Sequence, residues 1–570
     1  MSDNFCVRNF KSLLFAATIA EFAEFAVHLS NNVIAGQLIG EEGISALHLV
    51  VPLLSFLLFV TNIVCIGTYI CYSFEIGRFN REKAAQYFGQ GIILTILIGV
   101  IMTGISIIFR NNLIELLAGD HTVNEYVFEY FRFLPVVILL QPITLLLAQM
   151  VYVDGDKTVS AAAYICQILG NIIFSWVLCK KIGIAGVSLG TVISFILTLL
   201  VLSIHFFRKI NTIRFKWYAD YKDMLRIAKY SVVKSSSIFF FSLFTAIINT
   251  FMLSQGEEEY LPVFAVVMDM VELMVIFDGV EVALAPMFAT LHAEHNTKML
   301  GILVRESLKI AFIEGIVMTV LVLLFAKNMA ILFGLHDAEK ITIAASCLRI
   351  MSLSFCAAAV IKLLAGYYLH MEYVKLSIAV CSINGIAAPL IFVVFIVYVF
   401  GAVGLGVGMF FSPIFSLFMT ALIVYILYKK ENFPYLIDKT KDKNIYMYDI
   451  SLSQDTVMEI TDKIEHLLKE NNISGKSLIW VRLFSEEIGM MILEKNINKE
   501  ISAQYTVDLN SDEIKLIIRD DGVLFDITDT DSKISSLRSF VVSGIMEKQE
   551  IKFYQITTGY NRNAFKFPKA

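Results

Sequence analysis

The chain has 570 residues, of which 57% are hydrophobic and only 17% are charged, and its mean hydropathy is +0.71. Soluble globular proteins carry about 25% charged residues, so this composition excludes a chain that is soluble throughout. The net charge of −5 says little by itself, because the distribution of charge matters more than its sum. We expect no nucleic-acid partner.

Apolar segments long enough to cross a bilayer as helices recur along the chain, since about 20 such residues span the hydrocarbon core. We predict about twelve, near residues 10–36, 44–72, 91–109, 128–152, 159–179, 182–207, 231–254, 262–290, 310–333, 341–369, 376–400 and 404–428. The start, MSDNFCVRNF, lacks the pattern of a removable signal peptide, so the first helix is expected to remain. The sequence therefore predicts a polytopic α-helical membrane protein.

The distribution of Lys and Arg predicts the orientation of these helices. With the N-terminus in the cytoplasm, the inner loops contain the basic stretches at 78–83, 208–229, 298–309 and 429–430. The opposite side receives only Arg110, Lys180, Lys181, Lys327 and Lys340. By the positive-inside rule, we expect the N-terminus and the C-terminal domain to lie in the cytoplasm, with the helices in the cytoplasmic (plasma) membrane.

An internal repeat predicts two halves. Glycines at 183, 186 and 190 recur at 401, 404 and 408, an offset of 218 residues, and the same offset pairs Asn31 with Asn249. We therefore predict an N-lobe (1–210), an inter-lobe linker (211–230) and a C-lobe (231–428), with six helices in each lobe. Halves with an even number of helices share one orientation, so a pseudo-two-fold axis along the membrane normal should relate them, with a pathway between.

Several motifs resemble the MATE family of multidrug and toxin extrusion transporters. They are SNNVIAGQLIGEEGISALHLVVPL (30–53), VDGDKTVSAAAYICQILGNIIFSW (153–176), GIAGVSLGTVIS (183–194) and LRIMSLSF (348–355). The resemblance implies a secondary transporter, not an enzyme. It also implies export of small organic compounds, coupled to H⁺ or Na⁺, through a site between the lobes.

The first predicted helix departs from the family pattern. Asn31 stands where members commonly carry an aspartate, and Asn171 is followed four residues later by Ser175 instead of an aspartate. Helical spacing puts Glu21, Glu24, His28 and Asn31 on one face. We hypothesise that Glu24, together with Glu21 and His28, replaces the missing aspartate as the ion-coupling group. The alternative is a structural hydrogen-bond network with Gln167 or Asn171.

Acidic residues of the C-lobe lie on the predicted helix 262–290. Asp278 and Glu281, with Asn249 on the preceding helix, are the candidates for binding substrate or ion. Asp269 and Glu272 lie on nearly the opposite side of this helix, so all four carboxyls can point at one cavity only if the helix bends, for which Gly279 is a suitable place. Alternatively, they form structural ion pairs with Lys234 or Lys362. An acidic cavity favours cationic amphiphilic substrates.

After a linker (429–444), residues 445–570 are rich in charge and alternate between strand and helix patterns, which predicts a soluble α+β domain. FSEEIGMMIL (484–493), IIRDDGVLFD (517–526) and YNRNAFKF (560–567) resemble ATPases of the histidine-kinase type, nearest to the anti-sigma-factor kinases. The resemblance implies that Glu487 orients water and that Asp520 and Gly522 contact adenine.

Two departures predict that this domain hydrolyses ATP poorly. Met491 replaces the magnesium-binding asparagine, and a thioether is a poor ligand for a hard cation. The glycine box that covers the phosphates retains one glycine. Kinase or ATPase activity is therefore not expected, whereas ATP binding without turnover and a cytoplasmic protein partner both stay open.

The eight cysteines are scattered without a CxxC pair and are expected to pack as small apolar side chains. No metal site, no catalytic residue and no required cofactor is predicted. Two other functions stay open: a membrane sensor in which a transporter-like bundle controls the C-terminal domain, and a flippase for lipid-linked substrates.

Overall fold

The computed structural model describes most of the chain. The described residues are 5–77, 80–118, 124–208, 211–254, 260–294, 296–332, 335, 337–427, 436, 444–497, 499–510, 513–523, 537–548, 551–557 and 560–569.

The N-lobe is built from long helices joined by short turns. Its helices are α1 (Phe5–Leu38), α2 (Glu41–Gly77), α3 (Arg81–Ile108), α4 (Arg110–Ala118), α5 (Asn124–Tyr130), α6 (Leu134–Val153), α7 (Lys157–Ile182) and α8 (Ala185–Phe206). Within the described residues of this lobe, six helical segments are long and apolar enough to cross a membrane.

The C-lobe is less regular. Its helices are α9 (Tyr221–Ser254), α10 (Leu261–Leu273), α11 (Asp278–Ala293), α12 (Thr297–Leu332), α13 (Ala338–Ser352), α14 (Phe355–His370), α15 (Val374–Ser382), α16 (Phe395–Phe400) and α17 (Gly404–Leu427). Across the described parts of both lobes, nine segments qualify as membrane spans, or ten if α13 and α14, bent by 56°, count as one. This is fewer than the twelve expected, so that number stays a prediction.

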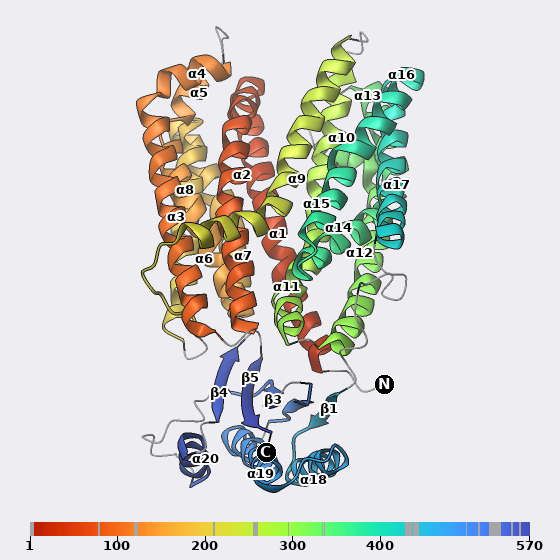
Figure 1. The fold of residues 1–570 in the computed structure, drawn as a ribbon. Coiled ribbons are helices and arrows are strands. Elements are labelled where there is room, and N and C mark those ends of the chain that lie inside the picture. Colours follow the sequence, from red (N-terminus) through yellow and green to blue (C-terminus); the bar gives the residue numbers. More distant parts are fainter. Residues whose placement is uncertain are drawn as a thin grey trace.

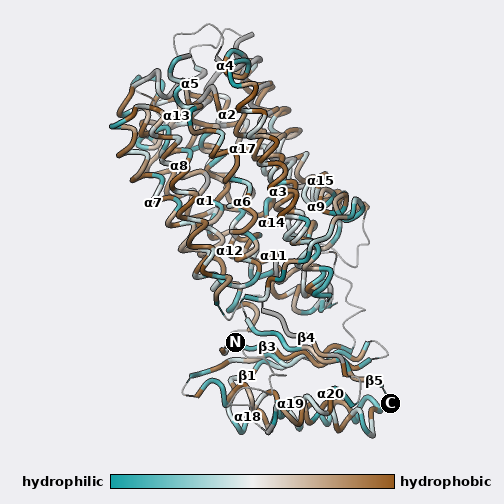
Figure 2. The backbone as a smooth tube through the Cα atoms, turned by 90° about the vertical axis from the view of Figure 1, so that its left-hand side faces the viewer, coloured by the Kyte–Doolittle hydropathy of each residue, from teal (hydrophilic) through white to brown (hydrophobic). Residues whose placement is uncertain are grey.

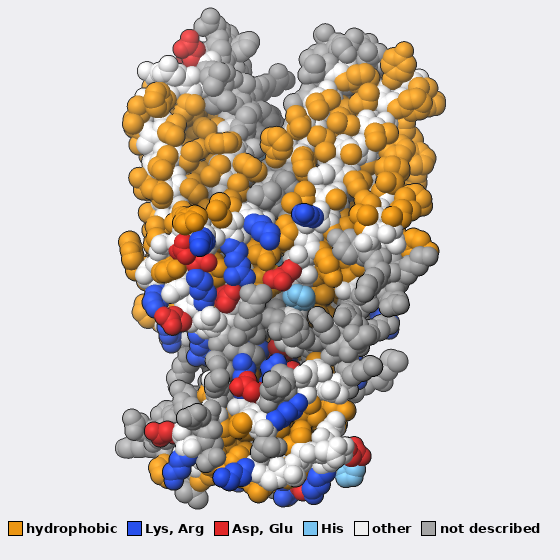
Figure 3. Space-filling model, viewed as in Figure 1, with side chains coloured by type: hydrophobic (Ala, Val, Ile, Leu, Met, Phe, Trp, Pro, Cys, Tyr) orange, Lys and Arg blue, Asp and Glu red, His pale blue; other side chains and the backbone are white. Residues whose placement is uncertain are grey.

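The helices stand side by side, with the C-terminal domain at one end (Figures 1 and 2). Figure 1 shows most N-lobe helices on one side and most C-lobe helices on the other, and the N-terminus lies at the end that carries the C-terminal domain. Figure 3 shows hydrophobic side chains covering the far part of the bundle, whereas Lys and Arg gather toward the C-terminal domain. This gradient agrees with a domain on the positive-inside side.

Glycines allow α7 and α8 to approach closely. A Cβ atom on Gly186 would lie 2.2 Å from the backbone carbon of Leu178, and one on Gly190 would lie 2.4 Å from the backbone nitrogen of Ser175. Small residues at such contacts are typical of helix packing in membranes, where dispersion between backbones replaces the hydrophobic effect. The repeated glycines thus serve helix packing in the N-lobe.

An ionic cluster fastens the turn between α6 and α7 to the end of α8. His205 Nε2 lies 2.9 Å from Asp154 Oδ2, and His205 Nδ1 lies 3.0 Å from Asp156 Oδ2. Arg208 donates to Asp156 at 2.7 Å, and the backbone N–H of Thr212 donates to Asp154 at 2.8 Å. The motif at 153–176 included the two aspartates of this turn, whereas their partner His205 was not identifiable from the sequence.

The acidic segment of the C-lobe is interrupted as expected, although not at Gly279. A 3₁₀ turn at Met274–Phe277 separates α10 from α11, so the irregular turn ends immediately before Asp278. The long helix α9 begins at Tyr221, ten residues before the apolar segment that the sequence indicated.

The C-terminal domain has the predicted α+β fold. Its elements are β1 (Ile445–Ser451), α18 (Gln454–Glu470), α19 (Gly475–Lys495), β2 (Ser502–Asp508), β3 (Glu513–Asp520), α20 (Leu537–Lys548), β4 (Lys552–Thr557) and β5 (Asn561–Pro568). The strands form one antiparallel sheet in the order β1-β2-β3-β5-β4. Figure 2 shows this sheet as a layer between the membrane helices and α18–α20.

Strand alternation explains why the sheet can contact both neighbours. Ile514, Leu516 and Ile518 of β3 join the apolar core with α18 and α19. Arg519, which follows Ile518 and so points to the other face of the sheet, contacts Glu294 at the end of α11. One sheet therefore carries an apolar face toward its own core and a polar face toward the membrane helices.

We predict that Gly186→Ala destabilises the protein by about 1–3 kcal/mol, the usual result of overpacking, because the new methyl group meets the backbone of α7. Gly104 of α3 has no atom within 4 Å of the corresponding position. Gly104→Ala is the matched control and should be neutral or stabilising by up to about 1 kcal/mol. Thermal unfolding of the purified variants measures both effects, and equal melting temperatures would contradict the packing argument.

Candidate functional site

A buried polar cluster lies between α1, α7 and α8. Ser30 Oγ donates to Asn171 Oδ1 at 2.7 Å, and Asn171 Nδ2 donates to Thr191 Oγ1 at 3.0 Å. Asn31 Nδ2 donates to the same threonine oxygen at 3.3 Å, and Ser175 Oγ donates to Asn31 Oδ1 at 3.5 Å. The structure thus brings the two predicted residues Asn31 and Asn171 together.

This N-lobe cluster consists of amides and hydroxyls, which do not titrate at physiological pH. It can bind a polar group or a cation through its oxygen atoms, but it cannot take up and release a proton. Sequence reasoning missed Ser30 and Thr191. The glycine run GIAGVSLGTVIS contained the signal for Thr191, because Gly190 brings this part of α8 against Ser175.

The acidic stripe of α1 is only partly described. Glu21 and His28 are half-buried, and Glu21 interacts electrostatically with the buried hydroxyl of Tyr152 on α6. The side chain of Glu24 lies outside the described residues, so its role stays a prediction. Asn31 and Asn171 both donate to Thr191 Oγ1 and so belong to one hydrogen-bond network. A structural network of this kind was the alternative to ion coupling.

The C-lobe acids form two pairs between α11 and α14. Lys362 Nζ donates to Asp278 Oδ2 at 2.8 Å, and about a quarter of each side chain is exposed. Glu281 Oε1 lies 2.8 Å from His370 Nε2, and each of these side chains is only 1% exposed. The ion pair of Asp278 with Lys362 was foreseen as an alternative, whereas His370 was missed. The side chains of Asn249 and Lys234 lie outside the described residues.

The Glu281–His370 pair fits tightly against α14. A Cβ atom on Gly366 would lie 2.1 Å from Glu281 Cγ, so only glycine leaves room for the glutamate to reach His370. Among the described residues, His370 Nδ1 is buried without a hydrogen-bond partner. The pair therefore holds an acid and a base in contact in the interior of the helix bundle.

Tyr152 connects the acids of the two lobes. Its hydroxyl is buried without a hydrogen-bond partner in the described part of the chain, and it interacts electrostatically with both Glu281 and Glu21. A phenol can donate or accept a hydrogen bond. Sequence reasoning did not identify Tyr152.

The predicted nucleotide-binding residues separate into two places. Asp520 is buried at the end of β3, where its Oδ1 accepts hydrogen bonds from Asn561 Nδ2 at 2.7 Å and from the Gly522 N–H at 3.0 Å. A Cβ atom on Gly522 would lie 2.6 Å from Asn496 Nδ2. Asp520 and Gly522 therefore belong to one compact turn that the protein's own side chains fill.

Glu487 of α19 is held by another partner. Arg538 of α20 donates to Glu487 at 2.6 Å and to Glu494 at 2.9 Å. Met491 on the same helix is buried in the apolar core. Glu487 is thus occupied by an intradomain ion pair, and Met491 packs as an apolar side chain.

The bundle of apolar helices with acid–base pairs buried between them defines a polytopic helical membrane protein of transporter type. The MatE family model matches residues 16–177 and 235–393, more than half of the chain. The chain therefore belongs to the MATE family of secondary transporters. No curated protein matches it.

Solved structures share this fold at low sequence identity. A MOP superfamily transporter from Pyrococcus furiosus, described as having a binding pocket of reverse polarity, is 18% identical with a TM-score of 0.66, covering 74% of this chain and 96% of that one. The Vibrio cholerae MATE transporter VcmN in its bent form is 15% identical with a TM-score of 0.63, covering 75% and 97%. An outward-facing multidrug resistance MATE transporter is 18% identical with a TM-score of 0.67, covering 73% and 94%.

We predict that Asp520→Asn stabilises the C-terminal domain at high pH. Burial raises the pKa of Asp520 to about 7, whereas an exposed aspartate titrates near pH ~4. Between these values the unfolded chain loses its proton first, so wild-type stability falls as the pH rises and the full penalty is present above pH 7. Asparagine keeps Oδ1 as an acceptor without the charge, and each unit of pKa shift corresponds to about 1.4 kcal/mol.

Hydrogen exchange of the β3 and β5 amides in the full chain measures this effect. The variant should be better protected than the wild type at pH 8, and the difference should disappear near pH 4. Asp462→Asn, at an exposed aspartate of α18, is the matched control. Equal protection of Asp520→Asn and wild type at pH 8 would refute the prediction.

Proposed function

We propose that this MATE family member is a cation-coupled antiporter that exports small organic, cationic amphiphilic compounds by alternating access. The coupling ion would be H⁺ or Na⁺, and the chain would lie in the cytoplasmic membrane with its N-terminus and C-terminal domain inside. Family membership supports transport itself. Coupling, substrate class and orientation are our inferences from the buried charges and from the distribution of Lys and Arg.

Twelve spans in two six-helix lobes, related by a pseudo-two-fold axis along the membrane normal, are the architecture that we propose for this mechanism. The glycine repeat with its offset of 218 residues supports it, as does the match of the family model in two blocks of similar length. Halves related in this way can rock about a central site.

The observation that carries the proposal is the buried Glu281–His370 pair. Buried charges in a membrane are expensive and are usually functional. A proton that binds to Glu281 would remove the negative charge that faces His370, so the contact between α11 and α14 would depend on protonation of the glutamate. The N-lobe cluster around Asn31 and Asn171 contains no titratable group, so our candidates for proton coupling are Glu281 and the α1 residues Glu21, Glu24 and His28, whereas the cluster could take part only in Na⁺ coupling.

The C-terminal domain is, in this proposal, a degenerate ATPase-like domain with a regulatory or interaction role. The ion pair of Glu487 with Arg538 and the buried position of Met491 both support an absence of efficient hydrolysis. Calorimetry on the full chain, with and without Mg²⁺, tests whether ATP binds without turnover.

We predict that Glu281→Gln abolishes proton-driven export and that His370→Gln does so as well. Glutamine preserves a hydrogen bond across the α11–α14 contact but cannot titrate. The measurement is the movement of a cationic dye in proteoliposomes under an imposed proton gradient, with a sodium gradient as the second arm. Glu115→Gln, at an exposed glutamate of α4, is the matched control and should transport like the wild type.

The possible outcomes separate the alternatives. Proton-driven transport by Glu281→Gln at the wild-type rate would remove the pair from coupling. Transport driven by sodium alone would assign Na⁺ as the coupling ion. A wild-type protein that moves no dye under either gradient would contradict the exporter and favour the membrane sensor.

Glu24→Gln tests the α1 hypothesis separately. If Glu24 supplies the carboxyl that is missing at Asn31, the variant should insert normally and lose proton-driven export in the same assay, because an amide cannot carry the proton. Full transport by this variant would contradict the hypothesis and leave coupling to the C-lobe pair.

A further inference from the structure

A buried glutamate fastens the C-terminal domain to the C-lobe. Glu294, at the end of α11, contacts the guanidinium groups of both Arg519 on β3 and Arg562 on β5. The three side chains are at most 3% exposed. Arg519 also donates to Gln504 at 3.1 Å and to Thr506 at 2.9 Å. Burying such charges is costly unless they are paired and hydrogen-bonded, so this contact is built for one docked position of the domain.

The same domain also holds α1 of the N-lobe. Arg8 forms an ion pair with Asp521 and donates to Ser502 Oγ at 2.8 Å. The ring of Phe5 meets the ring of Tyr560 edge to face, with centroids 5.3 Å apart. The C-terminal domain thus bridges the start of α1 and the end of α11, which belong to different lobes.

Both bridges start from one segment of the sheet. Arg519 reaches α11 and Asp521 reaches α1, while Asp520 between them turns to the opposite face of the sheet and forms the turn with Gly522 and Asn561. Among the described residues, Asp520 Oδ2 is buried without a hydrogen-bond partner. A displacement of Asp520 on the α19 side of the sheet would therefore also displace its neighbours Arg519 and Asp521, which contact α11 and α1.

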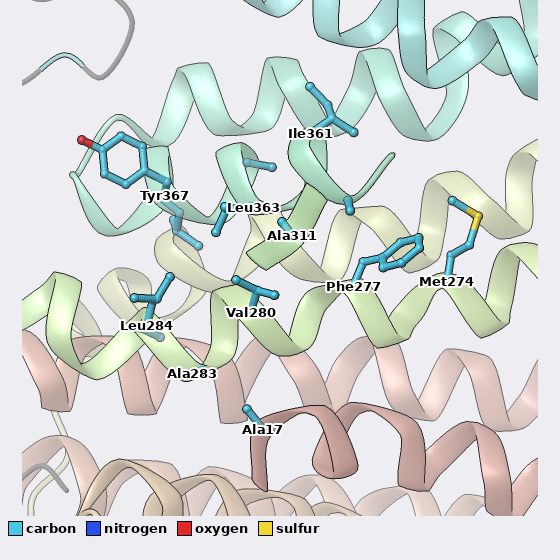
Figure 4. Packing of buried hydrophobic residues seen from close by; sticks show 14 of the residues in the cluster. Ala17, Met274, Phe277, Val280, Ala283, Leu284, Ala311, Ile361, Leu363 and Tyr367 are labelled. Atoms are coloured by element: carbon cyan, nitrogen blue, oxygen red, sulfur yellow. The ribbon is translucent and has the colours of Figure 1, made fainter. Parts of the chain in front are cut away.

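The lobes also touch each other directly, because α1 packs against α11. A Cβ atom on Gly279 of α11 would lie 2.7 Å from Thr18 Oγ1 of α1, and Figure 4 shows Ala17 of α1 beside α11 near Ala283. An inward opening would have to separate α1 from α11 beneath the docked domain.

We propose that the C-terminal domain is a latch that holds the two lobes together at the inner end, and that residues 519–521 are the element through which it is released. The latch rests on the proposed alternating-access function. It goes beyond that function by assigning the domain to one conformational step: the lobes open inward only after Glu294 or Arg8 has lost its partners.

Two thiols report the two parts of the latch in the full chain. Cys6 is fully buried at the interface, with Sγ 3.6 Å from Gln504 Oε1, so its alkylation measures undocking of the domain. A cysteine introduced by Thr18→Cys lies at the α1–α11 contact and measures separation of the lobes. Cys65, buried in α2 near Pro142, measures unfolding.

A membrane-impermeant maleimide applied to inside-out vesicles, with labelling quantified by peptide mass spectrometry, tests the latch. Glu294→Gln should raise the labelling of Cys6 and of the Thr18→Cys thiol by at least about tenfold, because it leaves two buried arginines without their charge partner. Arg8→Gln disrupts a partly exposed pair and should raise both by about twofold. Cys65 should stay unlabelled in each variant.

Matched substitutions within the domain provide the controls. Glu465→Gln and Arg482→Gln break an ion pair between α18 and α19 without touching the membrane helices, and they should leave both labelling rates unchanged. Increased labelling of Cys6 alone would overturn the latch, because the domain would then undock without releasing the lobes. Unchanged labelling of both thiols in Arg8→Gln and Glu294→Gln would overturn it as well.

These readouts do not require transport. A latch confirmed in a protein that moves no dye would leave the conformational inference standing and contradict only the proposed antiport. Normal dye transport with unaltered thiol labelling would leave the proposed antiport standing and contradict only the latch.

Discussion

Charge neutralisation inside an apolar helix bundle is the constraint on which the arrangement of this protein depends. Removing an ion from water costs several kcal/mol, and only a partner in hydrogen-bond contact offsets that cost. Several of the described acids in the interior accordingly occur with bases from another element. The contacts are Glu281 with His370, Asp278 with Lys362, Asp154 and Asp156 with His205, and Glu294 with Arg519 and Arg562.

These contacts lie where elements meet and not within single helices. The His205 cluster ties a turn to the end of α8, the Glu281 pair joins α11 to α14, and Glu294 joins the membrane helices to the sheet. Interior salt bridges contribute specificity of arrangement more than stability. These interior ion pairs therefore fix how the elements that they join are arranged relative to one another.

The N-lobe illustrates how a family site can keep its position and change its chemistry. Asn31 and Asn171 meet Thr191 in a tight cluster, but amides replace the carboxyls that the family pattern would supply. The helices still require hydrogen bonds in lipid, since unsatisfied polar groups there cost several kcal/mol. The cluster therefore supplies hydrogen bonds between α1, α7 and α8 from side chains that carry no charge.

The amino-acid sequence by itself determined the membrane-spanning character, the family and the order of strands and helices in the C-terminal domain. These features follow from hydropathy, periodicity and local motifs, which act over a few neighbouring residues. Asn31 and Asn171 were also identifiable in this way, as deviations from a motif. The tertiary structure alone decided the partners: Thr191 for the asparagines, His370 for Glu281, and Arg519 with Arg562 for Glu294. A buried acid can be neutralised by any base that the fold brings within about 3 Å. Glu294 and Arg519 are 225 residues apart in the sequence, so no local pattern indicates that they meet.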